Sequence, residues 1–444
     1  MQHILRKADK NGVNRRDLGV TFKNLTVKGE GSGISYGSSL TGALKSIPAL
    51  PKTLKAARHP KTKVILDEFT GMVKAGEMLL VLGRPGSGCT SFLKTLACQT
   101  ESFKEIDGTI SYDGAAPEEM AKHHRGDLAY LPEVRPLPLE PLPTCSTFTD
   151  AASPPLYQDD AHLPHLTVGQ TLDFAAAART PAVGGRVGSR EETITRKRDV
   201  LLSLFGLKHT FNTKVGDDLV RGVSGGERKR VSIAELLSTG CKIGCHDNST
   251  RGLDASTAVE YCRALRIATD LGNLTTILSI YQAGEQLYEL FDKVCVIYAG
   301  QQVFYGPMGD AVAYFKDMGY EPQPRQTSAD FLVAVTDPKG RFVRDGYEGR
   351  VPKTAEDFVR YWKKSEYYKR LVDEVDRELQ LHDTEQGQQR IENFRESARA
   401  DIVKRQSPKS SFLISYPCVS LSPPVALAHR YELRLTMSCT LLAG

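Results

Sequence analysis

Long hydrophobic runs are missing from this sequence. No window approaches the roughly 18 consecutive apolar residues that a membrane-spanning helix requires. The amino terminus is polar and has no apolar core of the kind found in a secretory signal. Paired metal-ligand spacing is also missing, because the close cysteine pair in "CKIGC" (241–245) has no second pair nearby. We therefore expect a chain that is cytosolic when taken alone, with reduced cysteines and no zinc site.

A strong charge of one sign is absent as well. The formal net charge is +5 over 444 residues and, apart from short basic runs such as 228–230, it is spread along the chain. This distribution gives no electrostatic footprint for DNA or RNA, so we expect no nucleic-acid partner. With 40% apolar and 25% charged residues, the chain can bury a large core and form two or three structural units.

The hydrophobic pattern alternates between strand and helix periods. Apolar and polar residues alternate over 19–27, which predicts an edge strand, and 63–83 reads as two strands joined by a turn at Ala75-Gly76. Segment 39–58 looks like a loop with some helix. The chain is helical from about Thr167 to Gly206, and a further helix starts near Ser224. Strand-like segments return in "KIGCHD", "TTILSIY" and "KVCVIYAGQQVFYG", so we predict an α/β core with a helical insertion.

A glycine-rich loop follows the apolar run that ends at Leu82 and leads directly into a helix. Its spacing matches the phosphate-binding pattern G-x-x-x-x-G-K-[ST] except for the lysine. The backbone N–H groups of such a loop surround phosphates, and the dipole of the following helix adds to their attraction. The predicted nucleotide-binding residues are Gly83, Arg84, Pro85, Gly86, Ser87, Gly88, Cys89, Thr90 and Ser91.

Cys89 stands at the lysine position of this loop. A thiol with its usual pKa of about 8.5 is neutral, and nearby phosphates disfavour its ionisation. Loss of one charge-assisted contact costs roughly 1.5 to 3 kcal/mol, while several backbone donors remain. We expect nucleotide binding to weaken and to survive.

A second motif extends this interpretation. Ser224, Gly225 and Gly226 lie at the start of an amphipathic helix, where backbone N–H groups and a hydroxyl face an anion. Together with "LDAST" from Leu253, and in this order, the motifs identify the chain as a member of the ATP-binding cassette (ABC) family. The fold implied is a P-loop (RecA-like) nucleotide-binding domain with an inserted helical subdomain. Several segments closely resemble the first nucleotide-binding domain of fungal pleiotropic drug resistance transporters of the G subfamily: "GRPGSGCTSFLKTLA", "HLPHLTVGQTLDFAAAARTP", "KVGDDLVRGVSGGERKRVSIAE", "CHDNSTRGLDASTAVEY" and "TSADFLVAVTDP".

The resemblance implies roles for individual residues. Thr90 and Asp247 would hold Mg²⁺, although Gly244 and His246 make the strand before Asp247 less apolar than the motif prefers. Asn248 stands at the position of the catalytic glutamate, and an amide cannot take a proton from water. Tyr281 stands at the switch-histidine position, where a phenol can donate a hydrogen bond without acting as an imidazole.

With Cys89, Asn248 and Tyr281 at these three positions, the resemblance implies an ATP site with little or no turnover. In the family, two cassettes pair head to tail, and each is followed by a membrane domain. Ser224, Gly225 and Gly226 would therefore complete the competent site of a second cassette in trans. The resemblance thus implies ATP and Mg²⁺ as cofactors, and a second cassette and transmembrane domains as partners. It also implies an integral membrane transporter whose cassettes lie at the cytoplasmic face.

The domain boundaries follow from the motifs and the composition. We predict a polar tail at 1–16, a nucleotide-binding domain at 17–340 with its helical subdomain at about 166–225, a charged and solvated helical linker at 341–410, and an irregular tail at 411–444. Residues 134–157 contain six prolines and fall where the family has a short Q-loop. We interpret them, and the tail after about 417, as foreign to the domain, from a retained intron or an incorrect gene model.

Two features and one functional alternative stay open at this point. The polar Q-loop residue is Glu133 or Gln158, and the aromatic residue that stacks on adenine is Phe22 or Tyr36, each of which also suits a core or a loop. The leading functional interpretation is the ATP-binding part of an efflux transporter. The alternative is a soluble regulatory or dominant-negative cassette, or the product of an incorrect gene model.

Overall fold

The computed structural model describes residues 17–30, 62–133, 162–180 and 189–405, apart from 218 and 239. The predictions for 1–16, 39–58, 134–157 and 411–444 lie outside these residues. Within the described residues, nine strands form one sheet in the order β4-β1-β2-β9-β8-β3-β7-β6-β5. The strands are β1 (Val20–Glu30), β2 (Thr62–Val73), β3 (Met78–Gly83), β4 (Glu105–Ser111), β5 (Leu128–Leu131), β6 (Ile243–Asp247), β7 (Thr275–Ser279), β8 (Lys293–Tyr298) and β9 (Gln301–Pro307).

The centre of the sheet is parallel and buried. β3 pairs in parallel with β7 and β8, and β6 pairs in parallel with β5 and β7. All residues of β3, β6 and β7 are buried, as expected for strands covered on both faces. The predicted strands at 63–83, "KIGCHD", "TTILSIY" and "KVCVIYAGQQVFYG" are confirmed. Because the phosphate loop follows β3, this loop leaves the sheet at the edge where the central parallel strands end.

The prediction of an edge strand at 19–27 is wrong in one respect. β1 lies between β4 and β2 and pairs antiparallel with both, so β4 is the terminal strand. Alternation correctly indicated a half-buried strand over 25–28, where Leu25 and Val27 are fully enclosed and the alternate residues 26 and 28 are partly exposed. Residues 20–22, before a shift in register, are all buried. Alternation could not show whether both edges of the strand are paired, because a strand inside an antiparallel sheet has the same period as one at its edge.

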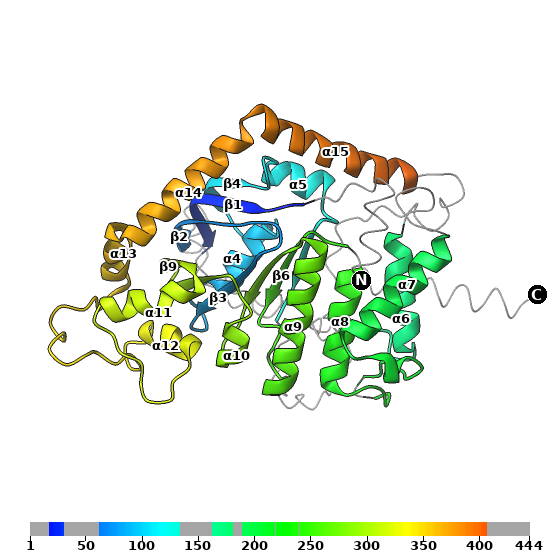
Figure 1. Cartoon of the computed structure of the whole chain (residues 1–444), viewed down its shortest axis with the longest axis horizontal. Helices are drawn as coiled ribbons and strands as arrows, with labels where there is room; N and C mark the ends of the chain where they lie inside the picture. Colours follow the sequence, from blue (N-terminus) through cyan, green and yellow to red (C-terminus); the bar gives the residue numbers. More distant parts are fainter. Residues whose placement is uncertain are drawn as a thin grey trace, which may run out of the picture.

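Helices flank the sheet on several sides (Figure 1). The group α6, α7 and α8 packs together beside the β5 end of the sheet, while α13, α14 and α15 run along the opposite region as a continuous arch (Figure 1). No helix within the described ranges is long and apolar enough to cross a membrane. The helices are α4 (Cys89–Leu96), α5 (Pro117–His123), α6 (Val168–Arg179), α7 (Arg190–Leu204), the 3₁₀ turn η2 (Lys208–Thr210), α8 (Gly225–Ser238), α9 (Ala255–Gly272), α10 (Glu285–Tyr288), α11 (Met308–Asp317), α12 (Ser328–Val335), α13 (Ala355–Lys364), α14 (Glu366–His382) and α15 (Glu385–Arg405).

Local capping explains where the inserted helices begin. The Thr167 hydroxyl accepts a hydrogen bond from the backbone N–H of Gln170 at 3.2 Å, and the Gln170 side chain accepts one from the N–H of Thr167 at 3.0 Å. Ser189 and Glu192 form the same reciprocal pair at the start of α7. Such capping boxes satisfy N–H groups that have no partner within the helix. The predicted helical character of the insertion is confirmed.

The carboxyl-terminal helices are not the solvated linker that their charge suggested. Phe358 and Trp362 of α13 are fully buried, and the Trp362 ring lies 5.4 Å from that of Phe304 on β9. Val375 of α14 is also buried, and Lys23 of β1 forms an ion pair with Asp376 at 2.5 Å. The charged residues cover one face of each helix while an apolar stripe packs on the sheet. The amino-acid composition of this region, which is rich in charged residues, gave no indication of the buried apolar stripe.

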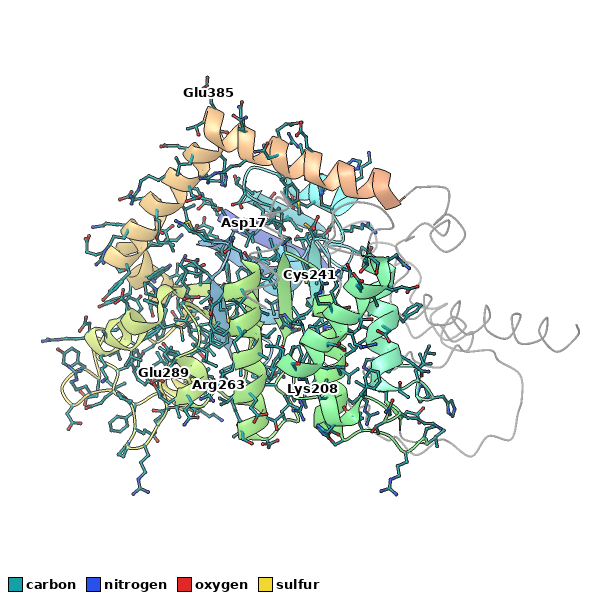
Figure 2. The ribbon with its side chains drawn as sticks, turned by 45° about the vertical axis from the view of Figure 1, so that its right-hand side comes forward. Asp17, Lys208, Cys241, Arg263, Glu289 and Glu385 are labelled. Carbon is teal, nitrogen blue, oxygen red and sulfur yellow. The ribbon has the colours of Figure 1, made fainter. Side chains whose placement is uncertain are left out.

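The last helix turns away from α14 and reaches α5. Glu385, at the start of α15, lies at the outer corner between the two helices (Figure 2). Farther along, the Arg395 guanidinium donates two hydrogen bonds to the Glu119 carboxylate at 2.7 and 2.8 Å. The Phe394 ring packs 4.8 Å from the His124 ring. The arch is therefore attached to the domain at both α14 and α15.

If α13 is part of the core, truncating its buried aromatic side chain will destabilise the whole domain. We expect Trp362→Ala to lower the free energy of unfolding by about 3–5 kcal/mol, as for other buried aromatic truncations. Arg360→Ala, two residues away with a side chain that is 73% exposed, should change it by less than about 1 kcal/mol. Urea unfolding followed by circular dichroism measures both changes. Equal, small effects would mean that α13 is a peripheral linker after all.

Candidate nucleotide-binding site

The phosphate loop has the backbone geometry that its glycines predict. Gly86 and Gly88 have φ values of 84° and 110°, in the left-handed region that disfavours other residues. A Cβ atom on Gly83 would lie 2.3 Å from the Ser87 hydroxyl, so this position also requires glycine. The backbone N–H of Ser87 closes a turn onto the carbonyl of Arg84 at 2.9 Å. The loop therefore leads into α4, whose second and third residues, Thr90 and Ser91, are partly exposed.

Cys89 begins α4 and points inward. Its side chain is buried, and its sulfur lies 3.4 Å from the Ser87 hydroxyl. Burial raises the pKa of the Cys89 thiol to about 11, with a smaller opposing effect from the Ser87 hydrogen bond. The thiol is therefore neutral at physiological pH, as expected, and contributes no positive charge to the loop.

Asp247 lies at the carboxyl end of β6, one strand away from the phosphate loop. Its two carboxylate oxygens accept hydrogen bonds from the Ser279 hydroxyl at 2.7 Å and the Tyr130 hydroxyl at 3.0 Å. Strand β7 lies between β3 and β6, and its Ser279 is in register with both Val81 and Asp247. The neighbours of Asp247 thus come from β5 and β7, and the sequence did not single them out. In a parallel sheet, the last residues of adjacent strands lie side by side. Aligning the ends of the predicted strands could therefore have placed Ser279 next to Asp247.

Asn248 follows immediately and is also buried. Its backbone has a positive φ of 43°, and its N–H donates to the Ser279 hydroxyl at 2.9 Å. Its side-chain N–H donates to the Glu133 carboxylate at 3.1 Å. Glu133, which is buried too, accepts a second, short hydrogen bond from Arg251. A neutral amide and an ion pair thus lie directly after Asp247, at the carboxyl end of β6.

One cleft is lined by some of these groups: Asn248 and Glu133 line it, whereas Cys89, Thr90 and Asp247 do not. It has a volume of about 1300 Å³ and is lined by both the phosphate loop, through Gly83 and Pro85, and the loops after β6 and β7. Tyr281, which follows β7, lies on this wall. The sequence-predicted residues that line it are Gly83, Pro85, Asn248 and Tyr281, together with Glu133 of the two Q-loop candidates.

The residues of the second motif, Ser224, Gly225 and Gly226, lie outside this cleft. We call the turn that they form the signature turn. Ser224 and Gly225 are exposed at the start of α8, and none of the residues 224–226 lines the cleft. The Ser224 N–H donates to the Glu227 carboxylate at 2.8 Å, and the Ser224 hydroxyl accepts from the Glu227 N–H at 3.3 Å. Nothing within 4 Å would oppose a Cβ on Gly225, so open space faces this turn. The signature turn is ordered and accessible without contributing to the cleft of its own chain.

Comparison with known proteins shows the family of this chain. The family model described as ABC transporter matches residues 66–251, and the one described as ABC-transporter N-terminal matches 1–43. The chain belongs to the ABC transporter family. It is 44% identical over 410 residues to the ABC multidrug transporter MDR1 of Trichophyton equinum, covering 92% of this chain and 24% of that protein. It is 42% identical to Protein SNQ2 of Saccharomyces cerevisiae and to the ABC multidrug transporter atrA of Aspergillus oryzae, in each case over 94% of this chain and 26% of the relative.

The chain thus spans about a quarter of the length of these curated relatives. The amino-terminal family model matches its first residues, and the relatives named above include two proteins described as ABC multidrug transporters. The chain is therefore similar to an amino-terminal nucleotide-binding cassette of such proteins. The predicted α/β P-loop fold with inserted helices is confirmed.

The structure bears on two choices that the sequence left open, the adenine-stacking aromatic residue and the Q-loop residue. Phe22 is fully buried, and its ring packs 5.3 Å from that of Phe92 and 6.0 Å from that of Tyr305, so it belongs to the core of the cassette and cannot stack on adenine. Tyr36 lies outside the described residues. For the Q-loop, Glu133 lines the cleft, whereas Gln158 lies outside the described residues.

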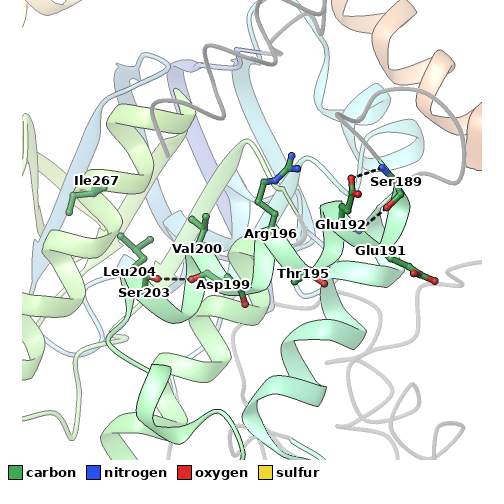
Figure 3. A pocket seen from close by; sticks show the side chains of 10 residues that line it. All are labelled: Ser189, Glu191, Glu192, Thr195, Arg196, Asp199, Val200, Ser203, Leu204 and Ile267. Atoms are coloured by element: carbon green, nitrogen blue, oxygen red, sulfur yellow. Dashed lines mark hydrogen bonds between the residues drawn. The ribbon is translucent and has the colours of Figure 1, made fainter.

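A second hollow of about 890 Å³ lies between α7 and α9 (Figure 3). Its lining includes three carboxylates, Glu191, Glu192 and Asp199, together with Arg196 and the partly exposed Ile267. None of the residues 83–91 of the phosphate loop lines this hollow. The hollow is therefore separate from the loop expected to bind phosphate.

His246, noted in the sequence as an unusual residue before Asp247, is enclosed in the cassette core. Its ring nitrogen lies 3.1 Å from the Tyr261 hydroxyl. Burial lowers the pKa of His246 from 6.5 to about 3, with a smaller contribution from Lys229. The imidazole is therefore neutral in the folded cassette and becomes protonated near neutral pH only after unfolding.

Protonation of His246 should make the cassette acid-sensitive. Because its folded pKa is depressed, its contribution to stability is complete above pH 6.5 and is lost as the pH falls toward 3. This one group should contribute a slope of up to about 1.4 kcal/mol per pH unit in that window. In His246→Gln, the fall in unfolding free energy between pH 6.5 and 4 should be shallower by this amount. Urea unfolding at several pH values measures it.

His123→Gln is the matched control, because the exposed His123 ring is in contact with water in both states. The control should have the same pH slope as the original chain. An unchanged slope in His246→Gln would show that His246 is not the group responsible for acid sensitivity.

Proposed function

We propose that this cassette binds ATP with Mg²⁺ at its phosphate loop, turns it over little, and activates ATP hydrolysis at a second cassette of a multidrug efflux transporter. The observation that carries the proposal is that the phosphate loop and the signature turn (224–226) lie at separate places on the cassette. The cleft beside the phosphate loop has neutral residues at the positions specific to hydrolysis, while the intact signature turn is exposed outside that cleft.

The described residues fit ATP and Mg²⁺. The loop from Gly83 to Gly88 leads into the start of α4, where backbone N–H groups and the helix dipole favour phosphate. Thr90 and Asp247 provide the oxygen ligands that Mg²⁺ prefers, and the hydrogen bonds from Tyr130 and Ser279 fix the orientation of the Asp247 carboxylate. Bound Mg²⁺ would neutralise part of the phosphate charge.

Low turnover follows from the groups around the expected γ-phosphate position. The Asn248 amide cannot accept a proton from an attacking water. Tyr281 on the cleft wall offers a hydroxyl in place of an imidazole. The Glu133 carboxylate faces the donors of Asn248 and Arg251, so it is engaged by protein groups. The cleft can hold a nucleotide in position without activating water.

The signature turn supports a catalytic role in trans. A helix start with an exposed hydroxyl and open space beside Gly225 is suited to contact a phosphate on another surface. Since residues 224–226 do not line the cleft of their own chain, a phosphate that they contact would be held by a partner. Head-to-tail pairing with a second cassette supplies such a phosphate, and transmembrane domains of the same transporter would use the resulting cycle for export.

Two substitutions should separate the two roles in a full transporter that contains this cassette. Ser224→Ala removes one positioned donor from the competent site, which commonly costs roughly 10² to 10³ in rate. Cys89→Ala removes a neutral, buried thiol, so its effect on ATP hydrolysis and drug efflux should be small. Comparable losses from the two substitutions would contradict a role in trans.

The purified 444-residue chain gives a second test. Alone, it should bind Mg·ATP in a calorimetric titration and release little phosphate. Mixed with an intact second cassette, it should support hydrolysis that is lost in Ser224→Ala. Rapid turnover by the isolated chain would mean that Asn248 and Tyr281 have been misinterpreted. Binding without any stimulation of a second cassette would favour a regulatory cassette without transport.

A further inference from the structure

The phosphate loop lacks the lysine that usually contacts the triphosphate. Cys89, which stands at this position, is neutral and buried. The basic side chains of Arg84 in the loop and Lys94 in the helix after it have other partners. Arg84 pairs with Asp337 at 3.1 Å, and the Lys94 ammonium lies 5.8 Å from the centre of the Tyr130 ring. If the cassette binds ATP as proposed above, the negative charge of the nucleotide must be balanced by some other group.

Arg251 is placed to balance it. It lines the same cleft as Gly83 and Pro85 of the phosphate loop, and 51% of its side chain is exposed. The turn that presents it is tight: the Arg251 N–H donates to the Asn248 carbonyl at 3.1 Å, and Asn248 has a positive φ. A guanidinium carries five N–H donors and can contact two phosphate oxygens at once. Both the positive charge of Arg251 and the arrangement of its N–H donors suit a triphosphate.

Glu133 is the hydrogen-bond and ion-pair partner of this guanidinium. The Glu133 side chain is only 5% exposed, and it accepts hydrogen bonds from both Arg251 and the Asn248 amide. Glu133 and Arg251 are 118 positions apart in the chain, so the fold, and not local sequence, brings them together. A phosphate that enters the cleft would compete with this carboxylate for the same donors.

We propose that Arg251 supplies to the bound triphosphate the positive charge that position 89 lacks, and that Glu133 competes with the nucleotide for it. This inference rests on the proposed ATP binding and adds a specific residue to it. It makes two linked statements: loss of Arg251 weakens ATP binding, and loss of the Glu133 charge strengthens binding only while Arg251 is present.

A double-mutant cycle on the 444-residue chain tests both statements, with Mg·ATP affinity measured by calorimetric titration. Arg251→Gln should raise Kd about tenfold, as expected for the loss of a charge-assisted hydrogen bond. Glu133→Gln should lower Kd by a few fold. The double variant should bind like Arg251→Gln alone. The control Arg360→Gln removes an exposed arginine on α13, outside the cleft, and should leave Kd unchanged.

Two further variants keep the result interpretable. Arg251→Lys retains the charge, so it should recover part of the affinity and shows that the effect is not a folding defect. Cys89→Lys restores a cation to the loop and should reduce the effect of Arg251→Gln to a few fold. Thermal unfolding without nucleotide verifies that each variant is folded.

The outcomes separate this inference from the proposed function. Failure of the original chain to bind Mg·ATP would overturn both. Normal binding that Arg251→Gln leaves unchanged would overturn the inference and leave the proposed function in place. If Glu133→Gln strengthens binding equally with and without Arg251, Glu133 acts by direct repulsion of phosphate, and the competition for Arg251 is disproved.

Discussion

Parallel pairing of β3, β7 and β6 is the constraint on which the site depends. Their registers bring Val81, Ser279 and Asp247 to corresponding positions, so three loops leave the sheet at one edge. Because the strands are fully buried, a shift of one residue would turn core side chains in the opposite direction and would misalign the loops. The hydrogen bonds of Ser279 with Asp247 and Asn248 then connect adjacent loops directly. The relative positions of Asp247, Asn248 and Ser279 follow from this register.

Within this framework, neutral groups replace charged ones without leaving buried polar atoms alone. The Cys89 thiol lies against the Ser87 hydroxyl, and the Asn248 amide donates to Glu133. An unsatisfied polar group in the same places would destabilise the fold by about 1–3 kcal/mol. The altered site is therefore compatible with a stable cassette.

The sequence predicted the features that depend on local pattern. The loop 83–88, the helix after it and the signature turn were recognised because glycine spacing and capping residues are sufficient to define them. Features that depend on distant contacts were missed. The buried stripe of α13 was hidden by its charged residues, and Phe22 proved to be a core residue because its partners, Phe92 and Tyr305, lie far along the chain. The contact of Glu133 with Arg251 crosses 118 positions and has no local signal.

The capping box at the signature turn also has an entropic consequence. Glu227 places a carboxylate of the same chain at the helix start, where it accepts the Ser224 N–H and keeps this turn in one conformation. The conformational entropy of the turn is therefore lost during folding and not during association with another molecule. A rigid turn can meet its counterpart with a smaller ordering penalty than a flexible one. The same carboxylate places a negative charge at the helix start, so a phosphate diffusing in solution should bind this turn only weakly.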